Sequence, residues 1–474
     1  MRSYYLPILL VVSCFFCEIL PLQAQNNKKP RVLVLTDIEA DPDDAQSMVR
    51  FLVYSNHWEV EGLIATTSIH QQNRVAPESI VQILEAYRKA LPNLLRHEKG
   101  FPSYETLRLV VKKGLAVYGM NGVGEGKDSE GSNWIIRALE RNDDRPLWVT
   151  VWGGSNTLAQ ALWKIRKTKT EAEATKLYSK LRVYTISDQD DSGPWIRKNF
   201  PTIFFIVTPG YNYAKASWLG ISFPAPGSDG SVVSADWLAK NIQQGHGPLG
   251  AAYPDMAYGM EGDTPSFLGL INNGLNDPEH PNYGGWGGRY EFYLPLFEDS
   301  NTGMFKRENW PKDEPETRPI WTNTSDSVYS LVDKQWHSGN LETIWRWRKE
   351  FQNDFSARMK WATKNYEECN HPPVPKLAHS SRFTVKSGEQ FYLNAGSSDP
   401  DGDSISYLWF QYAEAGTYKG IVSFKPYASN LYRLPVIAPA VDQPQTIHFI
   451  LKVTDKGEPP LTRYQRVIVT VVPR

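Results

Sequence analysis

Hydrophobic and polar positions in residues 30–271 alternate between short apolar runs and longer segments with helical spacing. The apolar runs have the length of buried strands and occupy residues 32–35, 60–65, 147–152, 181–186 and 203–207. Between them, apolar residues recur every three or four positions at 77–90, 132–139 and 156–166. Strands that alternate with helices are typical of a mostly parallel, Rossmann-like sheet with covering helices. The pattern therefore predicts an α/β domain, which we place at residues 30–368.

The pattern changes toward the C-terminus. Apolar positions spaced by three and four predict an amphipathic helix within 326–366. Repeated proline marks residues 369–376 as a linker, because proline cannot continue a helix. Beyond it, alternating residues predict an all-β immunoglobulin-like sandwich at 377–474. Its expected strands are 382–385, 390–394, 405–410, 446–454 and 463–472.

The first 24 residues have the features of a secretory signal peptide. A positive charge at Arg2 precedes an apolar core at 6–20, and residues 22–24 form a small-residue cleavage site. The core is too short for a convincing membrane span. After cleavage only Cys369 remains, which leaves no intramolecular disulfide. We therefore expect a secreted, periplasmic or cell-surface protein of a bacterium, with no membrane span.

Composition adds one exclusion and one hint. Lys and Arg total 51 against 52 Asp and Glu, so the net charge of -1 gives no support for a nucleic-acid polymer or an anionic membrane as partner. Aromatic residues make up 12% of the chain. Exposed aromatic faces suit stacking on sugar rings, although most such residues pack inside proteins. The oligomeric state stays open, a homo-oligomer included.

Five acids follow the first strand within eight residues: Asp37, Glu39, Asp41, Asp43 and Asp44. They stand where a buried parallel strand ends and a helix begins, and ligands bind at that edge of open α/β sheets. One or two acids would cap the helix and complement its dipole. Five concentrate negative charge at a Coulomb cost unless a cation neutralises it. The stretch therefore predicts a metal site.

Other strand ends and loops carry polar or aromatic candidates for substrate binding. His70 follows the second strand, Asn156 the third, and Asp190 and Asp191 the fourth. The remaining candidates are Glu261 and Trp286, the latter inside a Gly-Gly-Trp-Gly-Gly run that either admits a ligand to an aromatic face or forms a structural turn.

The run from the first strand through Asp43-Asp44-Ala45 resembles the opening motif of the nucleoside hydrolases, Asp-x-Asp-x-x-x-Asp-Asp, which holds a catalytic calcium. Without a gap, Glu39 takes the place of an Asp in that motif; with a two-residue insertion, Asp37 does. More closely, residues 36–47 resemble a family of secreted proteins with a nucleoside-hydrolase-like domain and a C-terminal β domain, some labelled cellulose-binding.

Two further segments extend the resemblance. Residues 153–159 are similar to a segment in which a backbone carbonyl binds calcium, and Asn156 holds the matching position. Residues 260–268 are similar to the family's late His-Asp-Pro segment, where Asp263 matches a calcium ligand and Gly262 replaces the catalytic histidine.

The resemblance implies a calcium-dependent hydrolase of N-glycosidic or glycosidic bonds acting on a nucleoside or carbohydrate. Ca²⁺ would be held by Asp37, Asp44, the carbonyl of Asn156 and Asp263. Asp37, Glu39 and Asp43 are the candidates for the catalytic base. The alternative is a non-catalytic carbohydrate-binding protein, for cellulose or another polysaccharide, with a structural calcium.

One more acidic turn lies in the β region. Residues 398–403 read Ser-Asp-Pro-Asp-Gly-Asp and resemble a turn of bacterial immunoglobulin-like domains. The acids fit either a second calcium site or a hairpin turn rich in Asx residues.

Overall fold

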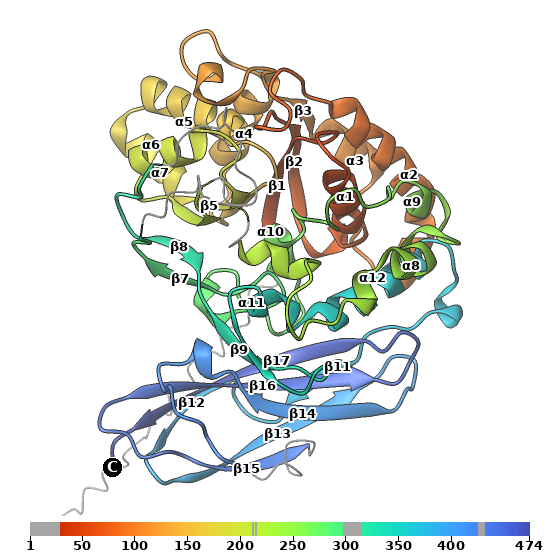
Figure 1. Ribbon diagram of the computed structural model, residues 1–474, viewed down its shortest axis with the longest axis vertical. Coiled ribbons are helices and arrows are strands. Elements are labelled where there is room, and N and C mark those ends of the chain that lie inside the picture. The colour runs from red at the N-terminus through yellow and green to blue at the C-terminus, as the bar shows by residue number, and fades with distance from the viewer. Residues whose placement is uncertain (1–28, 211–212, 214–215, 297–313, 425–431) are drawn as a thin grey trace, which may run out of the picture.

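The computed structural model describes residues 29–210, 213, 216–296, 314–424 and 432–474. The predicted signal peptide lies outside these residues. Within them, the N-terminal region is organised around a twisted sheet of eight strands, all parallel except β7 (Figure 1). Their spatial order is β3 (Val111–Lys113), β2 (Glu59–Ala65), β1 (Arg31–Thr36), β4 (Leu147–Val151), β5 (Leu181–Ser187), β6 (Phe204–Thr208), β8 (Ile320–Asn323) and β7 (Tyr290–Tyr293).

The central strands are buried on both faces, which explains their nearly continuous apolar sequences. In β1, Val32 and Val34 belong to one hydrophobic core, whereas Leu33 and Leu35 belong to the core on the opposite face. All six residues of β1 are buried. The predicted α/β fold is confirmed, and the five predicted strands correspond to β1, β2, β4, β5 and β6.

Helices cover both faces of this sheet. One core packs against α4, α5, α6 and α7, and the other against α1, α2 and α12 (Figure 1). No helix in the described part of the chain is long and apolar enough to cross a membrane. The helices are α1 (Asp43–Val53), α2 (Pro77–His97), α3 (Tyr104–Leu109), α4 (Glu130–Glu140), α5 (Asn156–Thr168), α6 (Glu171–Ser179), α7 (Ser192–Asn199), α8 (Ala235–Leu238), α9 (Gly247–Ala251), α10 (Pro265–Leu268), α11 (Glu342–Trp345) and α12 (Arg348–Trp361).

The helix predicted within 326–366 begins later than expected. Its first part is a hairpin of β9 (Asp326–Tyr329) and β10 (Trp336–Gly339), and helix follows only from Glu342. Trp336, counted in the helical pattern, is 68% exposed on this hairpin. The prediction was therefore wrong for the hairpin and right for α12, whose Phe351 and Phe355 are fully buried.

The C-terminal region forms the predicted β-sandwich, drawn in blue in Figure 1. One sheet has the order β11-β13-β15, and the other β12-β17-β16-β14. The alternating pattern predicted β12, β13, β14, β16 and β17 but not β11 and β15. The strands are β11 (Val374–Leu377), β12 (Arg382–Lys386), β13 (Gln390–Ser398), β14 (Ile405–Gln411), β15 (Arg433–Ile437), β16 (Gln445–Asp455) and β17 (Thr462–Val472).

The two regions share a hydrophobic core. Tyr464 of β17 packs edge-on against Trp286 and Trp347 of the N-terminal region. A buried ion pair joins Arg463 of β17 to Asp354 of α12, with 2.5 Å between Arg463 Nη1 and Asp354 Oδ2. The segment between the regions is not a free linker, because residues 374–377 form β11 and pair with β13.

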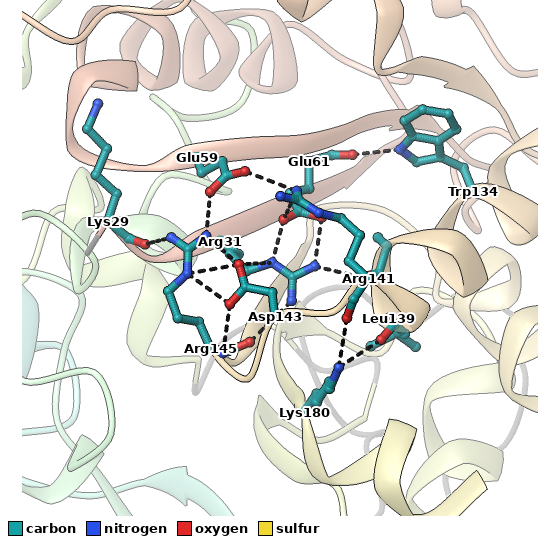
Figure 2. Close-up of polar contacts among 11 residues, drawn as sticks. Lys29, Arg31, Glu59, Glu61, Trp134, Leu139, Arg141, Asp143, Arg145 and Lys180 are labelled. Carbon is teal, nitrogen blue, oxygen red and sulfur yellow. Dashed lines mark hydrogen bonds and ion pairs between the residues drawn. The ribbon is translucent and has the colours of Figure 1, made fainter. Parts of the chain in front are cut away.

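At the amino edge of the central sheet, charged side chains form a network of ion pairs (Figure 2). Fully buried Arg31 at the start of β1 donates to Glu61 of β2, with 2.9 Å between Nη2 and Oε2. Arg145 bridges Asp143 and Glu59, at 2.6 Å from Nη2 to the Glu59 carboxylate. Each acid here has an arginine partner, so the network fastens the starts of β1 and β2 to the loop before β4.

Candidate functional site at the carboxyl edge of the sheet

The opposite, carboxyl edge of the sheet gathers the loops predicted to form a site. Because β2, β1, β4 and β5 are parallel neighbours, the loops that follow them lie side by side. Backbone hydrogen bonds connect these loops, at 2.8 Å from Gly154 N to Thr67 O and at 2.8 Å from Ile69 N to Gln189 O. The edge is therefore a braced surface rather than a set of independent loops.

An acid cluster lies at this edge, formed by Asp37, Asp41, Asp43, Asp44 and Asp263. Asp41, Asp43 and Asp44 each present a carboxylate oxygen within 4.8 Å of the others. The charge of Asp37 is close enough to raise the pKa of Asp43 and Asp44, and the charges of Asp43 and Asp44 in turn raise the pKa of Asp263. Thr36 at the end of β1 donates a hydrogen bond to Asp44 and fixes its orientation.

Burial and mutual repulsion determine the electrostatics of the acid cluster. Burial, followed by the charges of neighbouring aspartates, holds the pKa of Asp43, Asp44 and Asp263 well above the usual range. Burial raises the pKa of Asp37 to about 6, although a hydrogen bond with Ser68 lowers it. No arginine or lysine among the described residues forms an ion pair with any of the five. At the amino edge, by contrast, each acid has an arginine partner.

The donor set fits a hard divalent cation. Asp263 is 3% exposed, and its Oδ2 is buried without a hydrogen-bond partner among the described residues. Such an atom normally costs free energy unless something binds it. Carboxylate oxygens at several positions around one point are the ligands that calcium prefers. The residues present therefore fit the calcium that the resemblance implies.

Two glycines make room for the acids. A Cβ atom at Gly153 would lie 2.6 Å from Asp37 Oδ1, and one at Gly262 would lie 2.6 Å from Asp43 Oδ2. Both distances are shorter than van der Waals contact, so any side chain would displace a carboxylate. In the resemblance to nucleoside hydrolases, position 262 matches their catalytic histidine. Here the space that such a side chain would need is taken by Asp43 and by the ring of Trp218.

Glu39, a predicted base, points away from the acid cluster. Its backbone adopts the left-handed conformation, with φ of 77°. Its carboxylate pairs with Arg74 and accepts a hydrogen bond from Ser79 at the surface. The structure thus favours the alignment with an insertion, in which Asp37 rather than Glu39 belongs to the acids of the site.

Glu261, a predicted substrate ligand, is fully buried in an ion pair. It contacts Arg50 of α1, with 2.5 Å between Arg50 Nε and Glu261 Oε2. Tyr253 and Thr264 also donate to its carboxylate, at 2.8 and 2.9 Å. Every oxygen is engaged within the protein, so Glu261 positions the segment that carries Asp263 instead of meeting substrate.

Trp286 is likewise a core residue, which favours the second of the two alternatives, a structural turn, over a ring that faces a ligand. It is 0% exposed, and its indole N–H donates to Tyr464 Oη at 3.4 Å. The glycines beside it admit the sandwich rather than a ligand: a Cβ at Gly284 would lie 2.3 Å from Tyr412 Oη. The aromatic face faces β17, with no access for a sugar.

Three further candidates brace the loops. Asp190 is 1% exposed and accepts from the backbone N of Asn156 at 3.1 Å and of Ser192 at 3.0 Å, while burial raises its pKa to about 6. Asp191 accepts from Met120 N at 2.7 Å. The Asn156 side chain donates to Thr67 Oγ1 at 2.9 Å. The role of the Asn156 carbonyl as a calcium ligand stays a prediction.

Aromatic side chains border the acid cluster. Exposed His70 approaches Tyr213, with 3.4 Å between Nε2 and the phenol oxygen. Burial and then the charge of Asp37 raise the pKa of Tyr213, which places its hydroxyl near the cluster. Tyr213 packs edge-on against Trp218. Tyr213 and Trp218 were not among the predicted site residues, although they follow strand β6 as the other candidates follow their strands.

These features define a nucleoside-hydrolase-like α/β protein with an appended β-sandwich. Residues 31–290 match the family described as cellulose-binding Sde182, nucleoside hydrolase-like domain. Residues 390–471 match the family described as cellulose-binding protein Sde0182, C-terminal domain. The chain belongs to the Sde182 family.

Among solved structures, the chain is similar to a nucleoside hydrolase-related hypothetical protein from Saccharophagus degradans that is associated with carbohydrate metabolism. The two share 38% identity and a TM-score of 0.78, over 94% of this chain and 100% of that one. The fibronectin(III)-like modules of Clostridium thermocellum CbhA match 40% of this chain and 78% of that one at 11% identity and a TM-score of 0.15, which is too low to support a structural conclusion. No functionally curated protein matches the chain.

Proposed function

We propose that the protein is a calcium-dependent hydrolase that cleaves the bond to the anomeric carbon of a sugar. The leaving group is a nucleobase or another sugar. The observation that carries this proposal is the acid cluster at the carboxyl edge of a nucleoside-hydrolase-like sheet. Asp41, Asp43 and Asp44 present oxygens within 4.8 Å of one another, Asp37 and Asp263 interact electrostatically with them, and no described basic residue pairs with any of the five. An orphaned oxygen on Asp263 supports a cation there. A purely structural cap needs fewer acids.

Asp37, Asp44 and Asp263, with the carbonyl of Asn156, are the proposed calcium ligands. Bound calcium would lower the pKa of a water and hold sugar hydroxyls in place. Asp37 and Asp43 are the proposed bases that remove a proton from the attacking water, since Glu39 points outward.

The rim residues have proposed roles in binding and leaving-group departure. Trp218 is partly exposed beside Gly262, so its face is suited to packing against a sugar. With Glu261 held by Arg50, His70 is the proposed proton donor to the leaving group. It is exposed and contacts Tyr213, and an imidazole is a side chain that can donate a proton.

The test is sugar release by the protein lacking residues 1–24 from nucleosides, aryl glycosides and plant polysaccharides, with calcium or with chelator. Asp44→Asn and Asp263→Asn should abolish calcium-dependent release, whereas Asp144→Asn, an exposed acid of the same domain, should leave it unchanged. Release that persists in chelator, or in both site variants, would overturn the metal-dependent mechanism. No release from any substrate would overturn the hydrolase.

A second function, polysaccharide binding, is favoured by a different observation. Trp336 and Tyr329 on the β9–β10 hairpin are 68% and 45% exposed, and their ring centroids lie 5.7 Å apart. Paired exposed rings of this kind are suited to packing on the sugar faces of a polymer such as cellulose, and the family descriptions name cellulose binding. An exported protein, as residues 1–24 predict, would meet such a polymer outside the cell.

Retention on microcrystalline cellulose tests this second function. Trp336→Ala should reduce retention at least tenfold, while Tyr258→Ala, which removes an exposed ring elsewhere, should not. Equal retention of the two variants would exclude the hairpin as the binding surface. Neither outcome depends on hydrolysis, so the two proposed functions are tested separately.

A further inference from the structure

The acidic turn of the sandwich meets the segment that joins the two regions. Asp399, Asp401 and Asp403 each present a carboxylate oxygen within 4.8 Å of the others. Asp401 is held by His371 of the joining segment, with 2.6 Å from His371 N to Asp401 Oδ2 and 2.9 Å from His371 Nδ1 to Oδ1. On its own, a group of exposed acids is no site.

A fourth carboxylate, Asp455, adds an independent observation. It is 2% exposed at the end of β16, and its Oδ1 accepts hydrogen bonds from Asn370 Nδ2, Gly457 N and Leu461 N at 2.9 to 3.0 Å. Its Oδ2 is buried without a partner among the described residues. One oxygen of Asp455 therefore accepts three hydrogen bonds, and the other accepts none from the described residues.

The unpartnered Oδ2 of Asp455 lies next to the acidic turn. Asp455 pairs across the sheet with Ile405, two residues beyond Asp403. The charge of Asp399 contributes to raising the pKa of Asp455, after the larger effect of burial. Asp399 has the same asymmetry: its Oδ1 accepts from two backbone N–H groups at 2.9 and 3.0 Å, and its Oδ2 is buried and unpartnered within the described chain.

Asn370 supplies a third orphaned oxygen. Its amide NH₂ donates to Asp455 Oδ1 at 3.0 Å and to the Pro459 carbonyl at 2.8 Å. Both partners are acceptors, so the amide orientation is determined by its hydrogen bonds. Its Oδ1 is then buried without a donor from any described residue. No described lysine or arginine forms an ion pair with Asp399, Asp403 or Asp455.

We propose that Asp399, Asp403 and Asp455, with the amide oxygen of Asn370, form a second calcium site that fastens the sandwich to the joining segment. Carboxylate and amide oxygens are the hard ligands that calcium takes in large number, whereas magnesium keeps most of its waters. The site is separate from the acid cluster of the central sheet and does not depend on the proposed hydrolase. Asn370 lies in the joining segment, so the ion ties the two regions together.

Calcium stoichiometry of the whole mature chain tests the proposal, by titration calorimetry with Ca²⁺ alone. The Asp44→Asn, Asp263→Asn double variant removes the first site and should bind one calcium per chain. Adding Asp403→Asn should abolish this binding, together with the increase in melting temperature that calcium causes. Asp403 is suited to this test because no described residue donates to its carboxylate. Asp442→Asn in the same background is the matched control and should keep one calcium.

The result that overturns the proposal is a double variant that binds no calcium while its circular dichroism spectrum stays native. Retained binding after Asp403→Asn would also overturn it. A second variant, Asp399→Asn, guards against a local effect at residue 403, since both substitutions should abolish the same binding event. Loss of hydrolysis in the double variant has no bearing on the result.

Discussion

Asparagine in place of Asp44 should change the stability of the protein in opposite directions with and without calcium. Asp41, Asp43 and Asp44 present oxygens within 4.8 Å of one another. Two full charges at that separation repel by about 3 kcal/mol at an effective dielectric constant of about 20. Burial and mutual repulsion favour the protonated forms of these acids and so relieve part of the repulsion, and we expect a net gain of about 1 to 2 kcal/mol in chelator.

With calcium, the sign should reverse. An ion present at about 100 times its dissociation constant stabilises the folded protein by about 2.7 kcal/mol. Asp44→Asn removes a charged ligand and most of that gain. The amide oxygen can still accept the hydrogen bond from Thr36, so the local fold is preserved.

Thermal unfolding in chelator and in millimolar calcium measures both effects, with Asp144→Asn as the control for charge removal at the surface. The melting temperature of Asp44→Asn should exceed that of the wild type in chelator and fall below it in calcium. A variant that is less stable by the same amount under both conditions would refute the reasoning. It would mean that Asp44 only stabilises the N-terminus of α1 and that no cation binds there.

Three further predictions concern groups around the site. Glu261→Gln should lower the free energy of unfolding by about 3 kcal/mol in a urea titration, because it leaves the buried charge of Arg50 uncompensated; a change below about 1 kcal/mol would contradict the pairing. Gly262→Ala should weaken calcium binding by at least tenfold in calorimetry, because its Cβ displaces the Asp43 carboxylate, and unchanged affinity would contradict the crowding. The pKa of Asp354 is about 2, since its arginine partners outweigh the effect of burial; the stability it contributes, about 2 kcal/mol, is complete above pH 4 and lost as pH falls toward 2. Urea unfolding of Asp354→Asn should show lower stability at pH 7 and a smaller loss on acidification than the wild type, and parallel curves would exclude this role.

Much of the fold could be predicted because its signals are local. Each central strand is a run of apolar residues, and burial on both faces of a parallel sheet requires such a run. The hairpin at 326–339 was missed because apolar residues spaced like those of a helix, including Trp336, are exposed there. Strand β3 was missed because three residues give too little periodicity to recognise, and β15 because Pro435 interrupts its apolar pattern.

The density of acids after β1 could also be recognised locally, but their directions could not. Glu39 leaves the site through one left-handed residue in the turn. Glu261 is neutralised by Arg50, 211 positions earlier in the chain. Trp286 is covered by Tyr464, 178 positions later. The positions of Glu261 and Trp286 depend on contacts distant in sequence, and that of Glu39 on its backbone conformation; residue type and spacing reveal neither.

A series of polar contacts connects the sandwich to the helix that carries Asp43 and Asp44. Arg463 of β17 pairs with Asp354 of α12, and Asp354 accepts a hydrogen bond of 2.6 Å from Tyr54, the residue that ends α1. The same α1 begins with Asp43, the first of two acids of the cluster. A chain of direct contacts therefore runs from β17 through α12 to the end of α1 opposite Asp43. These contacts link the sandwich to the helix that carries two acids of the cluster.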